Sequence, residues 1–179
     1  AVLNGEADGE LVKKYKAVIP TLEKMRELYE VLERKARLRG YIDMSIDEAV
    51  VILDKEGNPT DVVRVERGVA ERIIEQFMLT ANEAVARYLS DREIPCVYRI
   101  HENPPVEKLA EFLTLAHNLG LNISGISAEN PNPSDLSRIL FEASERGIST
   151  SVSYSLLRSM SKAKYSDALS RHFGLAIDK

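Results

Sequence analysis

The sequence has very little cysteine, no tryptophan and no long apolar run. Cys96 is the only cysteine among 179 residues, so the chain can form no internal disulfide and no cysteine-based zinc site. Low cysteine usage without disulfides is typical of a reducing compartment, and we expect the protein to be cytoplasmic. The longest uncharged apolar stretch, residues 49–53, is far too short to cross a bilayer. Residues 1–6 also lack the basic-then-apolar order of a signal peptide, so we expect no membrane partner.

The sequence also has no excess of basic residues. The chain has 24 Lys and Arg residues against 28 Asp and Glu residues, which gives a net charge of −4. A compact nucleic-acid-binding domain is usually basic, so the composition alone argues mildly against one. Hydrophobic residues make up 44% and charged residues 29%, which excludes disordered and low-complexity sequence. The length is enough for a sizeable core.

Complete catalytic motifs are also absent. His101, His117 and His172 are scattered, and no His-x-x-x-His or His-Glu-x-x-His pair occurs. A two-metal nuclease centre needs several carboxylates that converge on two ions, and this sequence has no tight acidic cluster. We therefore expect no metal ligand and no catalytic residue in this chain. His101 follows an expected strand, where a hydrogen-bonded packing role is more common than a role in a pocket.

Helical periodicity dominates what the sequence does contain. Apolar residues recur at spacings of three and four along several stretches, which is the pattern of one helix face. The 69–89 stretch has the widest apolar stripe, so we expect that helix to be mostly buried. The pattern predicts helices from Pro20 to Gly40, over 69–89, from Pro104 to Gly120, from a Ser134 N-cap to Gly147, and over 151–164.

The remaining segments have β-like sequence. Residues 49–65 form two β-branched runs around the turn signal 55–59, which predicts a hairpin. Residues 41–44 and 96–100 are expected to be short and extended. The predicted fold class is therefore α/β or α+β, dominated by helices, with a small β-hairpin or sheet.

A basic run, Arg34 to Arg39, ends the first predicted helix. Cations at this end are favoured by the helix dipole. A solvated helix end is the usual role of such a run, and a phosphate contact is the alternative.

One carboxylate stands out in the 69–89 helix. At 100° per residue, Glu75 falls at the border of the apolar stripe, along the same edge as Glu71, Leu79 and Asn82. An ionised carboxylate accepts hydrogen bonds and donates none, so it suits a sugar hydroxyl in a cleft. The alternative is an ordinary solvated surface residue.

Longer stretches of the sequence are more specific than any single residue. In order and spacing, these stretches closely resemble the RNB-type catalytic domain of the ribonuclease R and ribonuclease II family of 3′-to-5′ exoribonucleases, and most closely the bacterial ribonuclease R branch. The resemblance runs essentially from end to end and includes Arg39-Gly40 and the hairpin. The stretches that carry it are Ile-Glu-Gln-Phe-Met-Leu-Thr-Ala-Asn-Glu-Ala-Val-Ala (74–86), Tyr-Arg-Ile-His-Glu-Asn-Pro-Pro (98–105), Leu-Gly-Leu (119–121), Leu-Arg-Ser-Met-Ser-Lys-Ala (157–163) and His-Phe-Gly-Leu-Ala (172–176).

The resemblance implies that residues 1–179 are an internal segment of one such catalytic domain. The family's acidic, magnesium-binding cluster is then expected upstream, and its motif His-Phe-Thr-Ser-Pro-Ile-Arg-Arg-Tyr downstream. The parent protein is expected to hydrolyse single-stranded RNA processively from its 3′ end to nucleoside 5′-monophosphates, with magnesium as cofactor. This segment would form part of the RNA channel, and alone it would hold no metal and be inactive. Its exposed apolar faces would favour self-association.

The resemblance also implies roles for individual residues. Glu75 matches the family's glutamate that hydrogen-bonds a ribose hydroxyl near the 3′ end, which distinguishes RNA from DNA through the 2′-OH. Met44 matches a position where relatives often hold a phenylalanine that closes a base stack, so the resemblance implies a base-stacking role for it. Arg99, His101 and Arg158 belong to the family pattern without an assigned step. The alternative function is a non-enzymatic helical module that binds RNA or protein.

Overall fold

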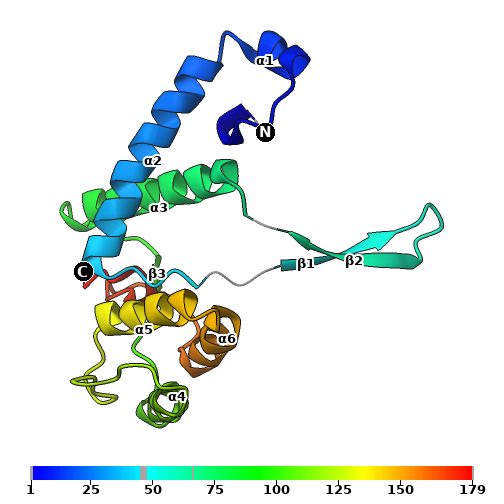
Figure 1. Cartoon of the computed structure of the whole chain (residues 1–179). Helices are drawn as coiled ribbons and strands as arrows, with labels where there is room; N and C mark the ends of the chain where they lie inside the picture. The colour runs from blue at the N-terminus through cyan, green and yellow to red at the C-terminus, as the bar shows by residue number, and fades with distance from the viewer. Residues whose placement is uncertain (1, 45–47, 66, 179) are drawn as a thin grey trace. The chain divides into compact units, whose positions relative to one another are not determined.

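The computed structural model describes residues 2–44, 48–65 and 67–178, and it divides into two compact units. Unit 1 consists of residues 1–35 and 66–94, and unit 2 of residues 36–65 and 95–179. The predicted class is confirmed: helices dominate, and the described strands form two small antiparallel sheets. In chain order (Figure 1) the elements are the 3₁₀ turn η1 (Val2–Asn4), α1 (Gly9–Tyr15), α2 (Ile19–Arg39), β1 (Glu48–Leu53), β2 (Pro59–Val65), α3 (Val69–Ser90), β3 (Tyr98–Ile100), α4 (Val106–Asn118), α5 (Pro133–Glu145), α6 (Ser149–Ser159), β4 (Lys164–Ser166) and the 3₁₀ turn η2 (Phe173–Leu175).

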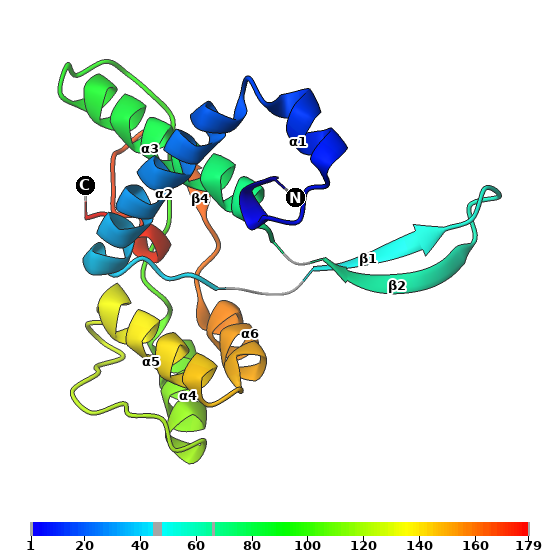
Figure 2. The ribbon, with the colours of Figure 1, turned by 45° about the horizontal axis from the view of Figure 1, so that its top comes forward.

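Unit 1 is built around two long helices, α2 and α3, which cross each other (Figures 1 and 2). Both helices follow the predicted spans to within one or two residues. The shorter α1 was not predicted, and it begins because the side chain of Asp8 accepts a hydrogen bond from the Leu11 N–H at 2.7 Å. At the helix crossing, Tyr29 of α2 and Ile73 of α3 are buried.

The expectation that the 69–89 helix is mostly buried is wrong for this chain. Ile73 is buried, but the apolar side chains of Ile74, Met78, Val85 and Tyr88 are 53% to 61% exposed. A wide apolar stripe needs partners on several sides. The described elements cover the Ile73 side of α3 and leave the rest of the stripe open to solvent.

The hydrophobic core of unit 2 lies among α4, α5, α6 and η2. Side chains from all four elements are fully buried there, and the shortened helix α6 packs against both α4 and α5. Removing these side chains from water supplies most of the driving force for folding of the unit. The largest of them are Phe112, Phe173, Leu109, Leu136, Ile139, Leu156 and Val152.

The structure confirms one of the predicted helix caps and corrects another. The glycine cap of α4 is confirmed, since Gly120 adopts a φ of +75° and the Leu121 N–H donates to the Ala116 carbonyl at 3.0 Å. The predicted Ser134 cap of α5 is wrong. Asn132 is the N-cap, and its side chain accepts from the Ser134 N–H at 3.0 Å, because Pro133 takes the first helical position that proline favours.

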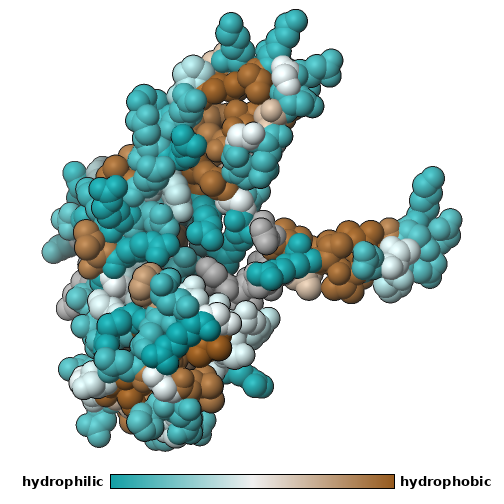
Figure 3. Space-filling view, viewed as in Figure 1, coloured by the Kyte–Doolittle hydropathy of each residue, from teal (hydrophilic) through white to brown (hydrophobic). Residues whose placement is uncertain are grey.

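The strands are partly as predicted. The hairpin forms with Val50 opposite Val63 and Val51 opposite Val62, and both strands are exposed, as the brown side chains in Figure 3 show. Residues 41–44 are extended but join no sheet. The last helix ends at Ser159 instead of residue 164, because residues 164–166 form β4 and pair with β3.

Across the described ranges, the helices are too short or too polar to span a membrane.

Candidate functional site

Glu75 lies in the second turn of α3, in unit 1. Its Oε2 atom accepts from the Nη1 atom of Arg67 at 3.1 Å, and the two side chains are 36% and 38% exposed. A pair this exposed adds little to stability, so its main effect is to orient the carboxylate. No second hydrogen bond to Glu75 occurs among the described residues, which leaves Oε1 available to a donor. Glu75 is therefore a half-exposed carboxylate on α3, and the ribose contact stays a prediction.

A polar contact fixes the start of α3 against α2. Tyr29 is 9% exposed, and its hydroxyl interacts with Arg72 of α3 and Glu33 of α2. Burial raises the pKa of Tyr29 above its usual value; the carboxylate of Glu33 adds to this rise, and the hydrogen bond with Arg72 opposes it. Arg72 lies one turn before Glu75, so this contact sets the orientation of the turn that carries the candidate carboxylate.

Met44 belongs to unit 2 and is half-buried against the hydrophobic core. The segment that carries it is held by the Ile42 N–H, which donates to the Gly174 carbonyl at 3.0 Å, and by Ser137 Oγ, which donates to the Tyr41 carbonyl at 3.2 Å. These two bonds hold Tyr41 and Ile42, the residues that lead to Met44. Its thioether can pack on a base face, although it lacks an aromatic ring. Glu75 and Met44 lie in different units, and each is described within its own.

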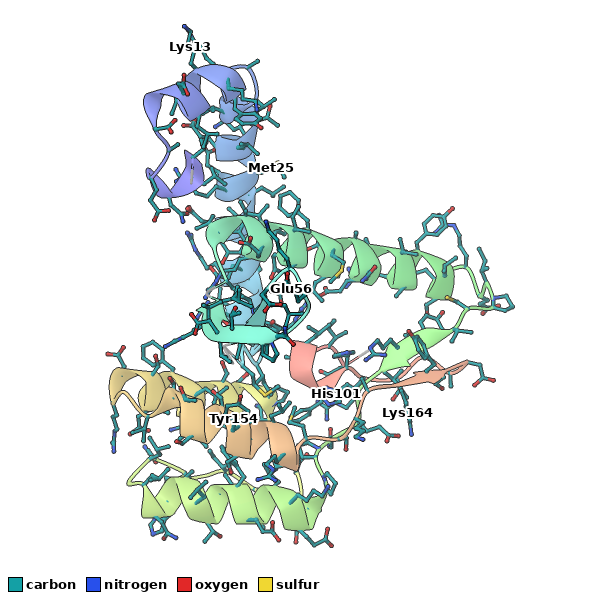
Figure 4. The ribbon with its side chains drawn as sticks, turned by 90° about the vertical axis from the view of Figure 1, so that its right-hand side faces the viewer. Lys13, Met25, Glu56, His101, Tyr154 and Lys164 are labelled. Atoms are coloured by element: carbon teal, nitrogen blue, oxygen red, sulfur yellow. The ribbon has the colours of Figure 1, made fainter. Side chains whose placement is uncertain are left out.

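His101 is a buried, hydrogen-bonded residue, which confirms the packing role expected for it. Its Nδ1 atom accepts from the Gly174 N–H at 3.2 Å, and its Nε2 atom lies 2.7 Å from the Ser161 carbonyl oxygen. Figure 4 labels it beside the sheet of β3 and β4. His172 meets the ring edge-on, with 5.3 Å between ring centroids. His101 therefore joins β3, the residues before β4, and η2.

Two other residues of the family pattern lie at the surface of unit 2. Arg99 on β3 stands over the ring of Tyr165 on β4, 5.5 Å from its centroid, and the tyrosine is 71% exposed. Arg158 is exposed in the last turn of α6. A cation over an exposed aromatic ring is a surface on which nucleic-acid bases can stack. The sequence did not indicate Tyr165, because its contact with Arg99 depends on pairing between strands far apart in the chain.

The described residues do not form a metal site. Among the described residues, no three side chains of the types His, Cys, Asp and Glu are placed together to hold an ion. Cys96 is a free cysteine and is partly buried. The residues present therefore do not fit a catalytic magnesium pair, and no step can be assigned to such a metal within this chain.

Comparison with known proteins identifies the family of this chain. The family model of the RNB domain matches residues 1–179. Ribonuclease R of Aquifex aeolicus is 39% identical over 171 residues, which cover 96% of this chain and 24% of that protein. Ribonuclease R of Escherichia coli is 31% identical over 176 residues, covering 98% of this chain and 21% of that protein. The chain therefore spans about a quarter of the length of these relatives, or less.

Solved structures agree with this match. Mycoplasma genitalium RNase R in complex with ribose methylated single-stranded RNA superposes with a TM-score of 0.87 and 26% identity, over 98% of this chain and 27% of that chain. The same enzyme in complex with double-stranded RNA gives a TM-score of 0.86 at 26% identity, over 98% of this chain and 30% of that chain. The fold described above therefore matches 27% to 30% of the chains in these two structures.

Proposed function

This chain belongs to the RNB domain family, and from this premise we propose that it is the RNA-contacting part of a 3′-to-5′ exoribonuclease of the ribonuclease R type. The reaction of the parent protein would be hydrolysis of single-stranded RNA to nucleoside 5′-monophosphates. Support comes from relatives named ribonuclease R and from the likeness to an RNase R that was solved with RNA. The cytoplasmic location proposed for it remains an expectation from cysteine usage alone.

The observation that carries the proposal is the carboxylate of Glu75. Arg67 orients it through Oε2, and Oε1 remains open among the described residues. A carboxylate accepts hydrogen bonds, so it can bind the ribose 2′-OH, a donor that DNA lacks. Glu75 would therefore favour RNA over DNA, while Met44 would pack against a base near the end of the stack.

We assign cleavage of the RNA backbone to residues of the parent protein that lie outside this chain. The parent protein would need magnesium ions to supply the chemistry of cleavage. Their ligands would have to come from outside this chain, because the described residues offer no fitting donor set. The contribution of this segment is to bind and orient the RNA strand. The alternative, a non-enzymatic binding module, would share the RNA contact but not the cleavage by the parent protein.

Binding measurements test the RNA contact directly. Fluorescence anisotropy with the 179-residue chain would compare a labelled single-stranded RNA with a DNA strand of the same sequence. We expect tighter binding of RNA, and we expect Glu75→Ala to weaken RNA binding while DNA binding stays unchanged. Glu111→Ala, which removes an exposed carboxylate on α4, is the matched control and should change neither. Equal binding of RNA and DNA by the unaltered chain would contradict the proposal.

A further inference from the structure

A polar pocket of about 270 Å³ lies in unit 2, between the end of α2 and the start of α5. Its lining brings together two arginines, Arg39 and Arg171, with the amide side chains of Asn130 and Asn132. Asp178 is the single acidic residue of the lining. The lining thus holds two guanidinium groups and one carboxylate, within a chain whose overall charge is negative.

Arg39 is held in place by the backbone. Its Nε–H donates to the Leu175 carbonyl at 3.0 Å, a bond between residues 136 positions apart. The next residue, Gly40, has a φ of +97°, and a Cβ there would lie 2.9 Å from the backbone of Ser134. The end of α2 is therefore tightly packed against the start of α5, and the exposed side chain of Arg39 is bonded to the backbone through Nε.

Arg171 is fixed at its two terminal nitrogens but not at Nε. Nη1 donates to Asn103 Oδ1 at 2.8 Å, and Nη2 donates to Asp178 Oδ1 at 3.0 Å. The Nε–H is buried and has no acceptor among the described residues. Buried donors without an acceptor are rare in folded proteins, so the hydrogen-bonding capacity of Arg171 is not fully used by the described residues.

The acidic partner of Arg171 differs from it in exposure to solvent. Asp178 is 89% exposed, although its carboxylate bonds an arginine that is only 30% exposed. A carboxylate and a phosphate are the two anions whose geometry matches a guanidinium fork. Asp178 therefore uses a donor of Arg171 that another anion could accept from, and its exposure means that little buried packing opposes such an exchange.

We propose that this pocket binds a phosphate group through Arg39 and Arg171, and that Asp178 competes with that group for Arg171. Resting on the proposed function, the phosphate belongs to the backbone of single-stranded RNA. The amide groups of Asn130 and Asn132 supply further donors at the rim. The site is separate from the Glu75 carboxylate, which recognises a ribose hydroxyl and lies in unit 1.

The test follows arginine side-chain Nε–H signals by NMR while inorganic phosphate is added to the 179-residue chain. Chloride at equal ionic strength is the reference. We expect a saturable shift of the Arg171 Nε–H signal with phosphate only. Arg39→Ala should weaken the affinity about tenfold or more, as loss of a charge-assisted contact does. Asp178→Asn should instead strengthen it, because the competing charge is gone. No phosphate-specific shift of the Arg171 signal, or weaker binding by Asp178→Asn, would overturn the proposal.

Two controls keep the result decisive. Arg138→Ala removes an exposed arginine of α5 that pairs with Asp135 outside the pocket, and it should leave phosphate binding unchanged. If Arg39→Ala fails to fold, the Asp178→Asn measurement still decides, because that side chain is exposed. Equal weakening by Arg138→Ala and Arg39→Ala would show a diffuse charge effect and refute a defined site.

A second titration, with a single-stranded RNA, asks two questions. It tests whether the bound phosphate belongs to the RNA backbone, and whether the chain binds RNA at all. RNA that shifts the Arg171 signal, and is displaced by phosphate, supports the assignment to the RNA backbone. RNA that binds with changes near Glu75 but none at Arg171 overturns that assignment and leaves the proposed function standing. RNA that does not bind at all contradicts the proposed function, while a phosphate-specific shift would still support the pocket as an anion site.

Discussion

Nδ1 of His101 accepts a hydrogen bond from the Gly174 N–H, and this one contact fixes the protonation of the ring. The opposite nitrogen, Nε2, lies 2.7 Å from the Ser161 carbonyl oxygen, which can only accept. Nε2 must therefore carry the proton, and the ring is the neutral Nε2–H tautomer. In the same turn, the Gly174 carbonyl accepts a hydrogen bond from the Ile42 N–H, two residues before Met44.

The first prediction concerns that tautomer. Nitrogen-15 NMR of the imidazole should show Nε2 protonated and Nδ1 unprotonated. His101→Asn keeps an acceptor for Gly174, His101→Gln keeps a donor for Ser161, and each should lose about 1–3 kcal/mol of stability because one buried group is left unpaired. His101→Leu, which loses both bonds, should be the least stable of the three in urea unfolding. A spectrum with Nδ1 protonated would contradict the assignment.

The second prediction concerns Gly40. An added Cβ would lie 2.9 Å from the Ser134 backbone, and the φ of +97° is strained for any other residue. We expect Gly40→Ala to destabilise the chain by about 2 kcal/mol or more, measured by urea unfolding. Gly9→Ala is the control, because nothing lies within 4 Å of its added Cβ and its φ is not positive. Equal stability of the two variants would contradict the close packing of α2 on α5.

The local part of the fold could be predicted from the sequence, and the long-range part could not. The 69–89 helix and the 49–65 hairpin have signals within single segments, so both were expected and both are present. Pairing of β3 with β4 joins strands more than 60 residues apart, and no local pattern predicts it. The cap of α5 was misplaced by two residues because Asn132 and Ser134 are both good N-caps, and the intervening Pro133 favours the earlier one.

The candidate site could likewise be predicted only in its local part. Helical periodicity placed Glu75 at the edge of α3, but its pairing with Arg67 depends on how the chain enters the helix. The Arg39–Arg171 pocket joins residues 132 positions apart in the sequence, so only the folded chain shows it. The basic run 34–39 was interpreted mainly as a solvated helix end, and Arg39 departs from that interpretation through its bond to the backbone of Leu175.

The third prediction uses the pKa of Tyr29, which is raised in the folded chain by burial and by Glu33. The stabilisation is complete below the unfolded pKa of about 10 and is lost as the pH rises through the higher folded value. The urea midpoint should therefore fall as the pH rises above about 10, and Tyr29→Phe should reduce that fall. The exposed Tyr154→Phe is the control. An unchanged pH dependence in Tyr29→Phe would show that Tyr29 does not cause it.

The fourth prediction is that the 179-residue chain, supplied with magnesium, does not degrade single-stranded RNA. The reason is that its described residues form no group of three or more metal-ligand side chains. A gel assay with a labelled RNA would check this, with the longer parent protein as the positive control. Magnesium-dependent shortening of the RNA by the purified chain would show that ligands are present after all.

Self-association of the isolated chain stays a prediction with its own measurement. The exposed side chains of Ile74, Met78 and Val85 lie along one face of α3. Sedimentation velocity should show association that Met78→Glu reduces, because the substitution places a charge in the middle of that apolar face. Leu38→Glu, at an 82% exposed residue of α2 outside that face, is the control. A monomer at all concentrations would contradict the prediction.

The most direct test of the account measures the RNA-to-DNA rate ratio of the longer parent protein. Single-stranded RNA and DNA of the same sequence would be degraded by the unaltered protein and by its Glu75→Ala variant. If Glu75 binds the ribose 2′-OH, the variant should lose rate on RNA, keep its rate on DNA, and so narrow the ratio. A ratio that is unchanged by Glu75→Ala would contradict the ribose contact on which the proposed function depends.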